Sequence, residues 1–243
     1  MKSTGIIISV IATLGFIGVA CILGSAYKYK YKVNNSINVT GNAKKDFEAD
    51  IVKWNATYSR KSMDLSIASE QLKQDRDLVK NFLIQKGIKE NEIQFNAVNI
   101  NRDFENNTDS NGRSYNTFTG YSLTQYVSVE SKELDKVDNA SREISALISQ
   151  GVELSSNAPS YYYSKLEDLK LALIGEASQN AKARAENIAK ESGSSLGSLL
   201  KADLGVFQIT GQNDNEDYSY GGVFNTTSRY KTANITVKAS FGQ

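Results

Sequence analysis

The chain has 243 residues, of which 28 are basic, 27 are acidic and none is histidine. This near-zero net charge argues against a general polyanion-binding protein, so no nucleic-acid partner is expected. Without histidine, and with Cys21 as the only cysteine, the common Cys/His zinc sites and the Ser-His-Asp and Cys-His nucleophilic systems are excluded. Any enzyme here would have to work with carboxylates, lysines, tyrosines and serines. Because no pattern in the sequence assembles a base, a nucleophile and an oxyanion site, we expect no catalytic residues, no metal site and no cofactor, with a histidine-free hydrolase as the remaining enzyme alternative.

The N-terminus contains an uncharged, largely apolar run over residues 3–27. As a helix rising about 1.5 Å per residue, the run is long enough to cross a hydrocarbon core of about 30 Å. It is also longer than the apolar region of a typical cleaved signal peptide. The sequence thus predicts a transmembrane anchor or signal-anchor over residues 1–27. A cleaved signal that ends in the small residues 24–26 is the alternative.

Tyrosine and lysine alternate from the last residue of this run, Tyr27, into the segment over residues 28–35. The residues are Tyr27, Lys28, Tyr29, Lys30, Tyr31 and Lys32. Tyrosine rings at the level of the headgroups and lysines that reach phosphates are typical of chains leaving a bilayer. We expect a membrane-interface collar here, with the lipid bilayer as partner. Taken alone, the positive-inside rule would keep these lysines in the cytoplasm.

Two strand patterns and a helix pattern open the rest of the chain. The strands are expected over residues 36–41 and 46–60, and the second places apolar side chains at a period of two. A helix is expected over residues 62–87, beginning at Ser62 and ending at Gly87.

A hairpin, a second helix and a further strand follow. Strands are expected over residues 91–104 and 115–130, joined by the turn-rich segment 105–114. The second helix is expected over residues 131–151, and a strand over residues 152–164.

A third helix is expected over residues 164–193, and the last two strands over residues 199–210 and 228–241. The apolar stripe of the helix changes from leucines to the small residues Ala177, Ala181 and Ala185. Small side chains let backbones approach closely, so we expect this half of the helix to pack tightly.

This order of elements, ββαββαβαββ, predicts the fold class. We expect an α+β domain over residues 36–243, with a mostly antiparallel sheet, three helices packed on it and one N-terminal transmembrane helix in front.

Polar and aromatic residues provide the remaining candidates. Asp75, Arg76 and Asp77 are adjacent on a helix and do not converge on one point, so we expect them on a solvated face. Three consecutive tyrosines on a strand cannot all face the core, and further aromatic residues lie in the long loop 211–228. Because tyrosine is enriched at protein interfaces, we predict an oligomer interface at Tyr161, Tyr162, Tyr163, Tyr218, Tyr220 and Phe224. The alternative is an edge strand and a loop that contact nothing.

Three motifs resemble those of the SIMPL-domain family of bacterial envelope proteins. An "I-x-V-x-G" opening lies at residues 37–41, and a "GI-x-x-x-x-I-Q" segment lies at residues 87–94. The helix "EASQNAKARAENIA" at residues 176–189 is similar to the family's alanine-rich helix. The similarity spans about residues 36–243.

The resemblance implies an exported, periplasm-facing domain that self-associates, is linked to envelope or oxidative stress, and has no established catalytic activity. With the predicted anchor, it implies a single-pass protein of the bacterial inner membrane that acts as a homo-oligomeric envelope scaffold, for example a ring. A soluble periplasmic protein is the alternative location. A ligand- or partner-binding module of the envelope stress response, without catalytic activity, is the alternative function.

Overall fold

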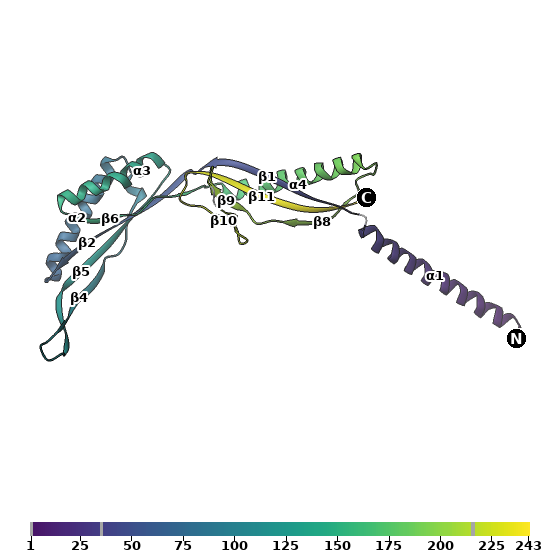
Figure 1. Cartoon of the computed structure of the whole chain (residues 1–243), viewed down its shortest axis with the longest axis horizontal. Helices are drawn as coiled ribbons and strands as arrows, with labels where there is room; N and C mark the ends of the chain where they lie inside the picture. The colour runs from purple at the N-terminus through teal and green to yellow at the C-terminus, as the bar shows by residue number, and fades with distance from the viewer. Residues whose placement is uncertain (1, 35, 215–216) are drawn as a thin grey trace.

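The computed structural model describes residues 2–34, 36–214 and 217–243, with the side chains of its first helix described over residues 13–29. The molecule is an elongated arch, from one end of which α1 projects while a long hairpin extends from the other (Figure 1). The helices in the described ranges are α1 (Lys2–Asn34), α2 (Leu65–Gln85), α3 (Leu134–Glu143) and α4 (Leu166–Glu191), with the 3-10 helices η1 (Glu90–Glu92) and η2 (Ile144–Gln150).

Sheet A forms the part of the arch next to α1. Its strands are β1 (Ser36–Glu48), β8 (Leu199–Leu204), β9 (Gln208–Gly211), β10 (Val223–Phe224) and β11 (Tyr230–Gly242). The central strand β11 pairs antiparallel with β1 along one side, and with β9 and then β8 along the other. The short β10 runs parallel to β9.

Sheet B forms the other part of the arch. Its strands are β2 (Ile51–Ser62), β3 (Ile93–Phe95), β4 (Asn99–Thr108), β5 (Ser114–Ser131), β6 (Glu153–Ser156) and β7 (Ser160–Tyr162). The long strands β2 and β5 pair with each other, and the shorter strands pair antiparallel with one of these two.

Each sheet carries helices on one face and has its own core. Helices α2 and α3 pack on sheet B, where the predicted period-two residues are all buried: Val52, Trp54, Ala56 and Tyr58. Helix α4 packs on β1 and β11 of sheet A. In Figure 1, α4 lies above the strands of sheet A, and the opposite face carries no helix.

The chain is α+β, but the predicted arrangement of its elements is wrong in two respects. The first is the single sheet. The first two long strands belong to different sheets, because β1 pairs with β11 while β2 pairs with β5. Strand alternation alone does not specify which strand pairs with which, so the division was not visible in the sequence.

The second error concerns the N-terminus. Within the residues that the structure describes, no helix is both long and apolar enough to cross a membrane. The predicted transmembrane helix over residues 1–27 and the single-pass inner-membrane location are therefore overturned.

Several predicted elements also begin or break elsewhere. Helix α2 is capped by Asp64 and not by Ser62, because the Asp64 carboxylate accepts hydrogen bonds from the Ser66 and Ile67 amides. Gly87 follows this helix with a φ of 82°, a left-handed conformation that favours glycine. The predicted strand 152–164 is divided into β6 and β7.

A close approach between α4 and β1 fixes sheet A to its helix. Gly41 of β1 faces the small residues Ala177 and Ala181 of α4, both fully buried. A Cβ atom at Gly41 would lie 2.5 Å from the Ala181 nitrogen and 2.8 Å from its Cβ. The two backbones are therefore as close as they can be with glycine at this position, in agreement with the tight packing predicted from the alanine stripe.

Replacing Gly41 with alanine should destabilise the protein, because the obstacle is backbone that cannot move aside. We expect Gly41→Ala to lower the free energy of unfolding by about 3 kcal/mol, the upper range for an overpacked site. Gly175→Ala is the control: it lies on α4, the helix that Gly41 contacts, and its Cβ would meet nothing within 4 Å. That control should be neutral or stabilising by up to about 1 kcal/mol. Equal effects in denaturant unfolding would contradict the assignment.

Candidate functional site

The helix-free face of sheet A is the candidate site. The alternating side-chain directions along β11 determine which residues form it. The residues directed at α4 are buried: Ala233, Ile235, Val237 and Ala239. Their neighbours in the strand point to the opposite face. These are Asn234, Thr236, Lys238 and Ser240.

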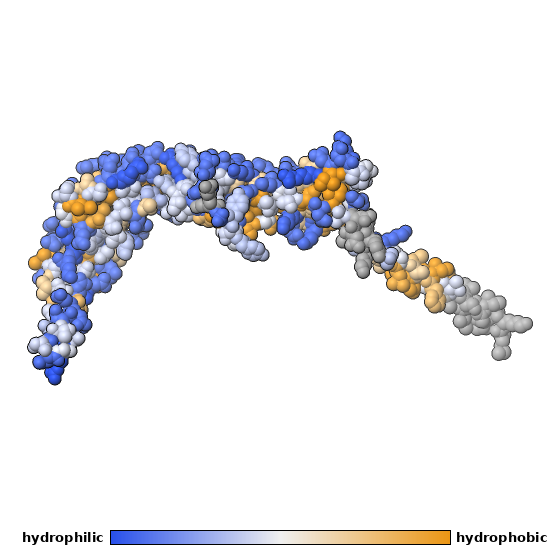
Figure 2. Space-filling view, viewed as in Figure 1, coloured by the Kyte–Doolittle hydropathy of each residue, from blue (hydrophilic) through white to orange (hydrophobic). Residues whose placement is uncertain are grey.

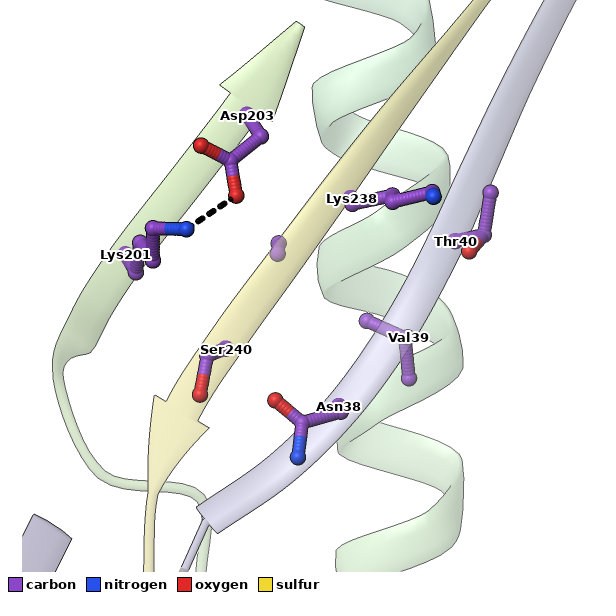
Figure 3. A pocket seen from close by; sticks show the side chains of 8 residues that line it. Asn38, Val39, Thr40, Lys201, Asp203, Lys238 and Ser240 are labelled. Atoms are coloured by element: carbon purple, nitrogen blue, oxygen red, sulfur yellow. Dashed lines mark ion pairs between the residues drawn. The ribbon is translucent and has the colours of Figure 1, made fainter. Parts of the chain in front are cut away.

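Strands β1 and β8 add polar side chains in register with those of β11. Two rows of three residues cross the sheet, Thr40–Lys238–Asp203 and Asn38–Ser240–Lys201. Together they line an open depression of about 310 Å³ (Figure 3). The surface is thus a grid of hydroxyl, amide and charged groups supported by the α4 core beneath it.

The depression has a net charge of +1, from two lysines and one aspartate. Lys201 Nζ lies 2.6 Å from Asp203 Oδ2, with the two side chains 71% and 56% exposed. Such an exposed pair contributes less than about 1 kcal/mol to stability. The Lys238 side chain is directed toward Thr40 (Figure 3), so Lys201 and Asp203 form a separate pair at the sheet edge.

A second depression, of about 410 Å³, adjoins the first through Lys238. Two tyrosines of the long loop, Tyr218 and Tyr220, line it, and both are largely exposed. The Asn234 amide donates a hydrogen bond to the Tyr218 hydroxyl at 2.8 Å. The buried Oδ1 of the same amide has no hydrogen-bond partner among the described residues.

This arrangement can bind by hydrogen bonds and by aromatic contact. Within the described ranges, no group of three or more His, Cys, Asp or Glu residues could hold a metal ion. The hydroxyl, amide, charged and tyrosine side chains that line the two depressions are the groups available for such contacts. We therefore treat the face as a binding surface.

The six predicted interface residues do not lie on one surface. Tyr161 turns toward the core of sheet B, where its hydroxyl donates a hydrogen bond to Asp138 at 2.8 Å. Tyr163 turns toward the core of sheet A, with its ring centroid 5.0 Å from that of Phe47. These two side chains are packing residues.

Tyr162, between these two, points the other way. Its ring lies 6.5 Å from that of Phe224, which is itself exposed. Tyr218 and Tyr220 lie beside the second depression. The structure thus leaves Tyr218, Tyr220 and Phe224 exposed and Tyr162 half-buried, and the role of these residues in an oligomer interface stays a prediction.

The predicted collar is part of α1. Tyr27 and Tyr29 are exposed, and because residues two apart on a helix differ by about 200° around its axis, they lie on opposite sides. The side chains of Lys30, Tyr31 and Lys32 lie outside the described residues.

The prediction for Asp75 was wrong. This carboxylate is 1% exposed, and it accepts two hydrogen bonds from the Arg60 guanidinium, at 2.5 and 2.7 Å. These bonds raise the pKa of Arg60. Helix periodicity could have indicated the burial, because Asp75 falls between Leu72 and Val79 on the apolar stripe, but only the tertiary fold brings Arg60 of β2 to it.

Loss of this buried carboxylate should be costly, because it leaves the Arg60 charge without its partner. We expect Asp75→Ala to lower the free energy of unfolding by about 3 kcal/mol. Glu130→Ala, which removes the exposed ion pair with Lys53 at 2.9 Å, should change it by less than about 1 kcal/mol. Urea unfolding of both variants tests the difference, and a small effect at Asp75 would contradict it.

Tyr161 should make stability depend on pH in the alkaline range. Burial, and then the hydrogen bond to Asp138, raise the pKa of Tyr161 to about 12, whereas an unfolded tyrosine titrates near about 10. Between these values the unfolded state loses the proton first, so stability falls as pH rises. In Tyr161→Phe the fall between pH 10 and 12 should be shallower. Unfolding curves with parallel pH dependence for both proteins would refute this.

Comparison with known proteins identifies the family. The profile of the SIMPL family, described as a protein of unknown function (DUF541), matches residues 37–240. This range covers both sheets and the helices α2, α3 and α4. No curated protein matches the chain. Since the match covers well over half of the sequence, the chain belongs to the SIMPL family.

Proposed function

We propose that this SIMPL protein is a non-catalytic scaffold that works by assembling with further copies of itself. The observation that carries the proposal is the apolar surface along the outer strand of sheet A. The exposed fractions are 54% for Leu199, 43% for Leu200 and 53% for Leu204, with Val206 close by at 51%. Exposed large apolar residues gathered along one strand in this way mark interaction sites on proteins.

The described part of α1 adds a second apolar surface, visible as the orange region of the projecting helix in Figure 2. Its exposed large side chains are Leu14, Phe16, Ile17, Val19, Ile22 and Leu23. This helix projects from the arch (Figure 1), so its removal should leave the two cores intact. The two apolar surfaces can therefore be tested separately.

Light scattering across a concentration series tests the proposal on the full chain and on a chain that begins at Ser36. We expect both to have masses above that of one subunit, which for the full chain is 26.7 kDa. Association of the full chain alone would assign it to α1 and would contradict a scaffold built from the sheets. Monomers of both chains at high concentration would overturn the proposal altogether.

A ligand-binding module is the second candidate, favoured by one observation. The unpartnered Asn234 Oδ1 lies beside two exposed tyrosines on the helix-free face. A polar ligand donating to this oxygen would be recognised there. Both depressions are at the small end of the range for ligand pockets, which favours the scaffold.

A further inference from the structure

The two outer edges of sheet A differ in whether their backbone groups have partners. At the β1 edge, the Asn42 amide donates to Asn180 Oδ1 at 3.2 Å, and the Thr40 carbonyl accepts from Arg184 at 2.9 Å. Both partners belong to α4. The helix therefore covers this edge, as proteins commonly do to prevent pairing with another chain.

The β8 edge carries no such cover. Strand β8 pairs only with β11 among the described strands, and all six of its residues are exposed. The Gly205 amide donates to the Thr236 carbonyl at 2.8 Å, which fixes the direction of the backbone groups along β8. By the alternation of an antiparallel ladder, Lys201 and Asp203 face β11, whereas Ala202 and Leu204 direct their N–H and C=O groups outward.

The side chains of β8 also lack cover on the face that α4 shields elsewhere. Leu199, Ala202 and Leu204 are paired with Phe241, Ala239 and Val237, whose side chains belong to the apolar cores beneath α4. Because α4 lies over β1 and β11, an apolar groove of about 510 Å³ runs between the helix and β8. Backbone groups and apolar side chains are therefore unpartnered along the same strand.

On the other face of β8, the order of the two charges makes the strand complementary to a second copy of itself that runs in the opposite direction. Lys201 and Asp203 are two residues apart, with Ala202 between them. When two such strands run antiparallel with the Ala202 residues opposite each other, each Lys201 lies opposite an Asp203. A charged edge strand normally resists pairing, but in this arrangement the pairing joins opposite charges.

We propose that β8 pairs antiparallel with β8 of a second copy, centred on Ala202, so that the two copies of sheet A become one continuous sheet. This inference rests on the proposed scaffold function and names its interface. The contact is two-fold symmetric, so Lys201 meets Asp203 of the second copy twice. On the groove side, the exposed Leu199 and Leu204 of each copy flank the paired residues.

Other symmetric registers satisfy fewer groups. Centring the pair on Lys201 or Asp203 sets like charges directly opposite each other, which is destabilising. It also places inward-facing backbone groups at the centre, where they already bond to β11. Centring on Leu204 satisfies backbone groups but moves both charges away from their partners.

Charge reversal on the full chain tests the register. Lys201→Glu alone and Asp203→Lys alone each create two like-charge contacts in the pair. We expect each to weaken self-association about tenfold, from cross-strand terms of about 0.2–1 kcal/mol at each of the two contacts. An equimolar mixture of the two variants restores both contacts, because Glu then meets Lys and Asp meets Lys. Sedimentation velocity should show association as strong as that of the wild-type chain for the mixture, and weaker association for each variant by itself.

Two further variants control the interpretation. Lys44→Glu reverses a charge at an exposed position on β1 and should leave association unchanged. Ala202→Pro removes an outward N–H while sparing the bonds to β11, and should weaken association, since proline is tolerated on edge strands. Circular dichroism confirms that each variant is folded.

The outcomes separate the interface from the function it serves. If the wild-type chain associates while both single variants behave like it, the β8 register is overturned and the scaffold function stands. If the single variants associate weakly and their mixture does not recover, the register is again overturned. If the wild-type chain is monomeric, both proposals fail.

Discussion

The contact between Gly41 and the alanine stripe of α4 determines how sheet A is covered. With no side chain on Gly41 and only methyl groups on Ala177 and Ala181, the helix can lie directly against β1. This position brings Asn180 and Arg184 to the backbone of β1 and closes that edge. It also leaves β8 beyond the reach of the helix, because one helix cannot cover the full width of the sheet.

The asymmetry of sheet A follows from this single placement. One edge is closed by side chains of α4, and the other exposes backbone groups and leucines together. On the helix-free face, the charged residues of β8 lie in register with polar residues of β11 and β1. A surface for assembly and a surface for polar contacts therefore lie at adjacent parts of the same sheet.

Sheet B is stabilised by a different means. Its core combines aromatic and aliphatic side chains from two strands and two helices with a buried ion pair, Arg60 to Asp75. Such a pair contributes little beyond an apolar core but is costly to break, because the Asp75 carboxylate is desolvated. The pair therefore specifies how α2 lies on β2 more than it adds net stability.

Local sequence patterns predicted the alternating directions of the three tyrosines, but they did not predict the polar rows or the exposed leucines of sheet A. Three adjacent tyrosines had to point in alternating directions, and the structure turns Tyr161 and Tyr163 toward two different cores. The sequence could not show that these cores are separate. The polar rows of the helix-free face were missed, because alternation of polar residues in a strand is typical of any exposed face. The β8 leucines were missed because leucines in a strand usually indicate burial.

Residue types at fixed local spacing were sufficient to predict the family, the α+β class, the buried faces of the long strands and the tight packing of the alanine stripe. The division into two sheets, the partner of Asp75 and the difference between the two edges of sheet A became visible only in the folded chain. These features depend on which distant segments pair and on where α4 ends its coverage, and both are set by contacts between residues far apart in the chain.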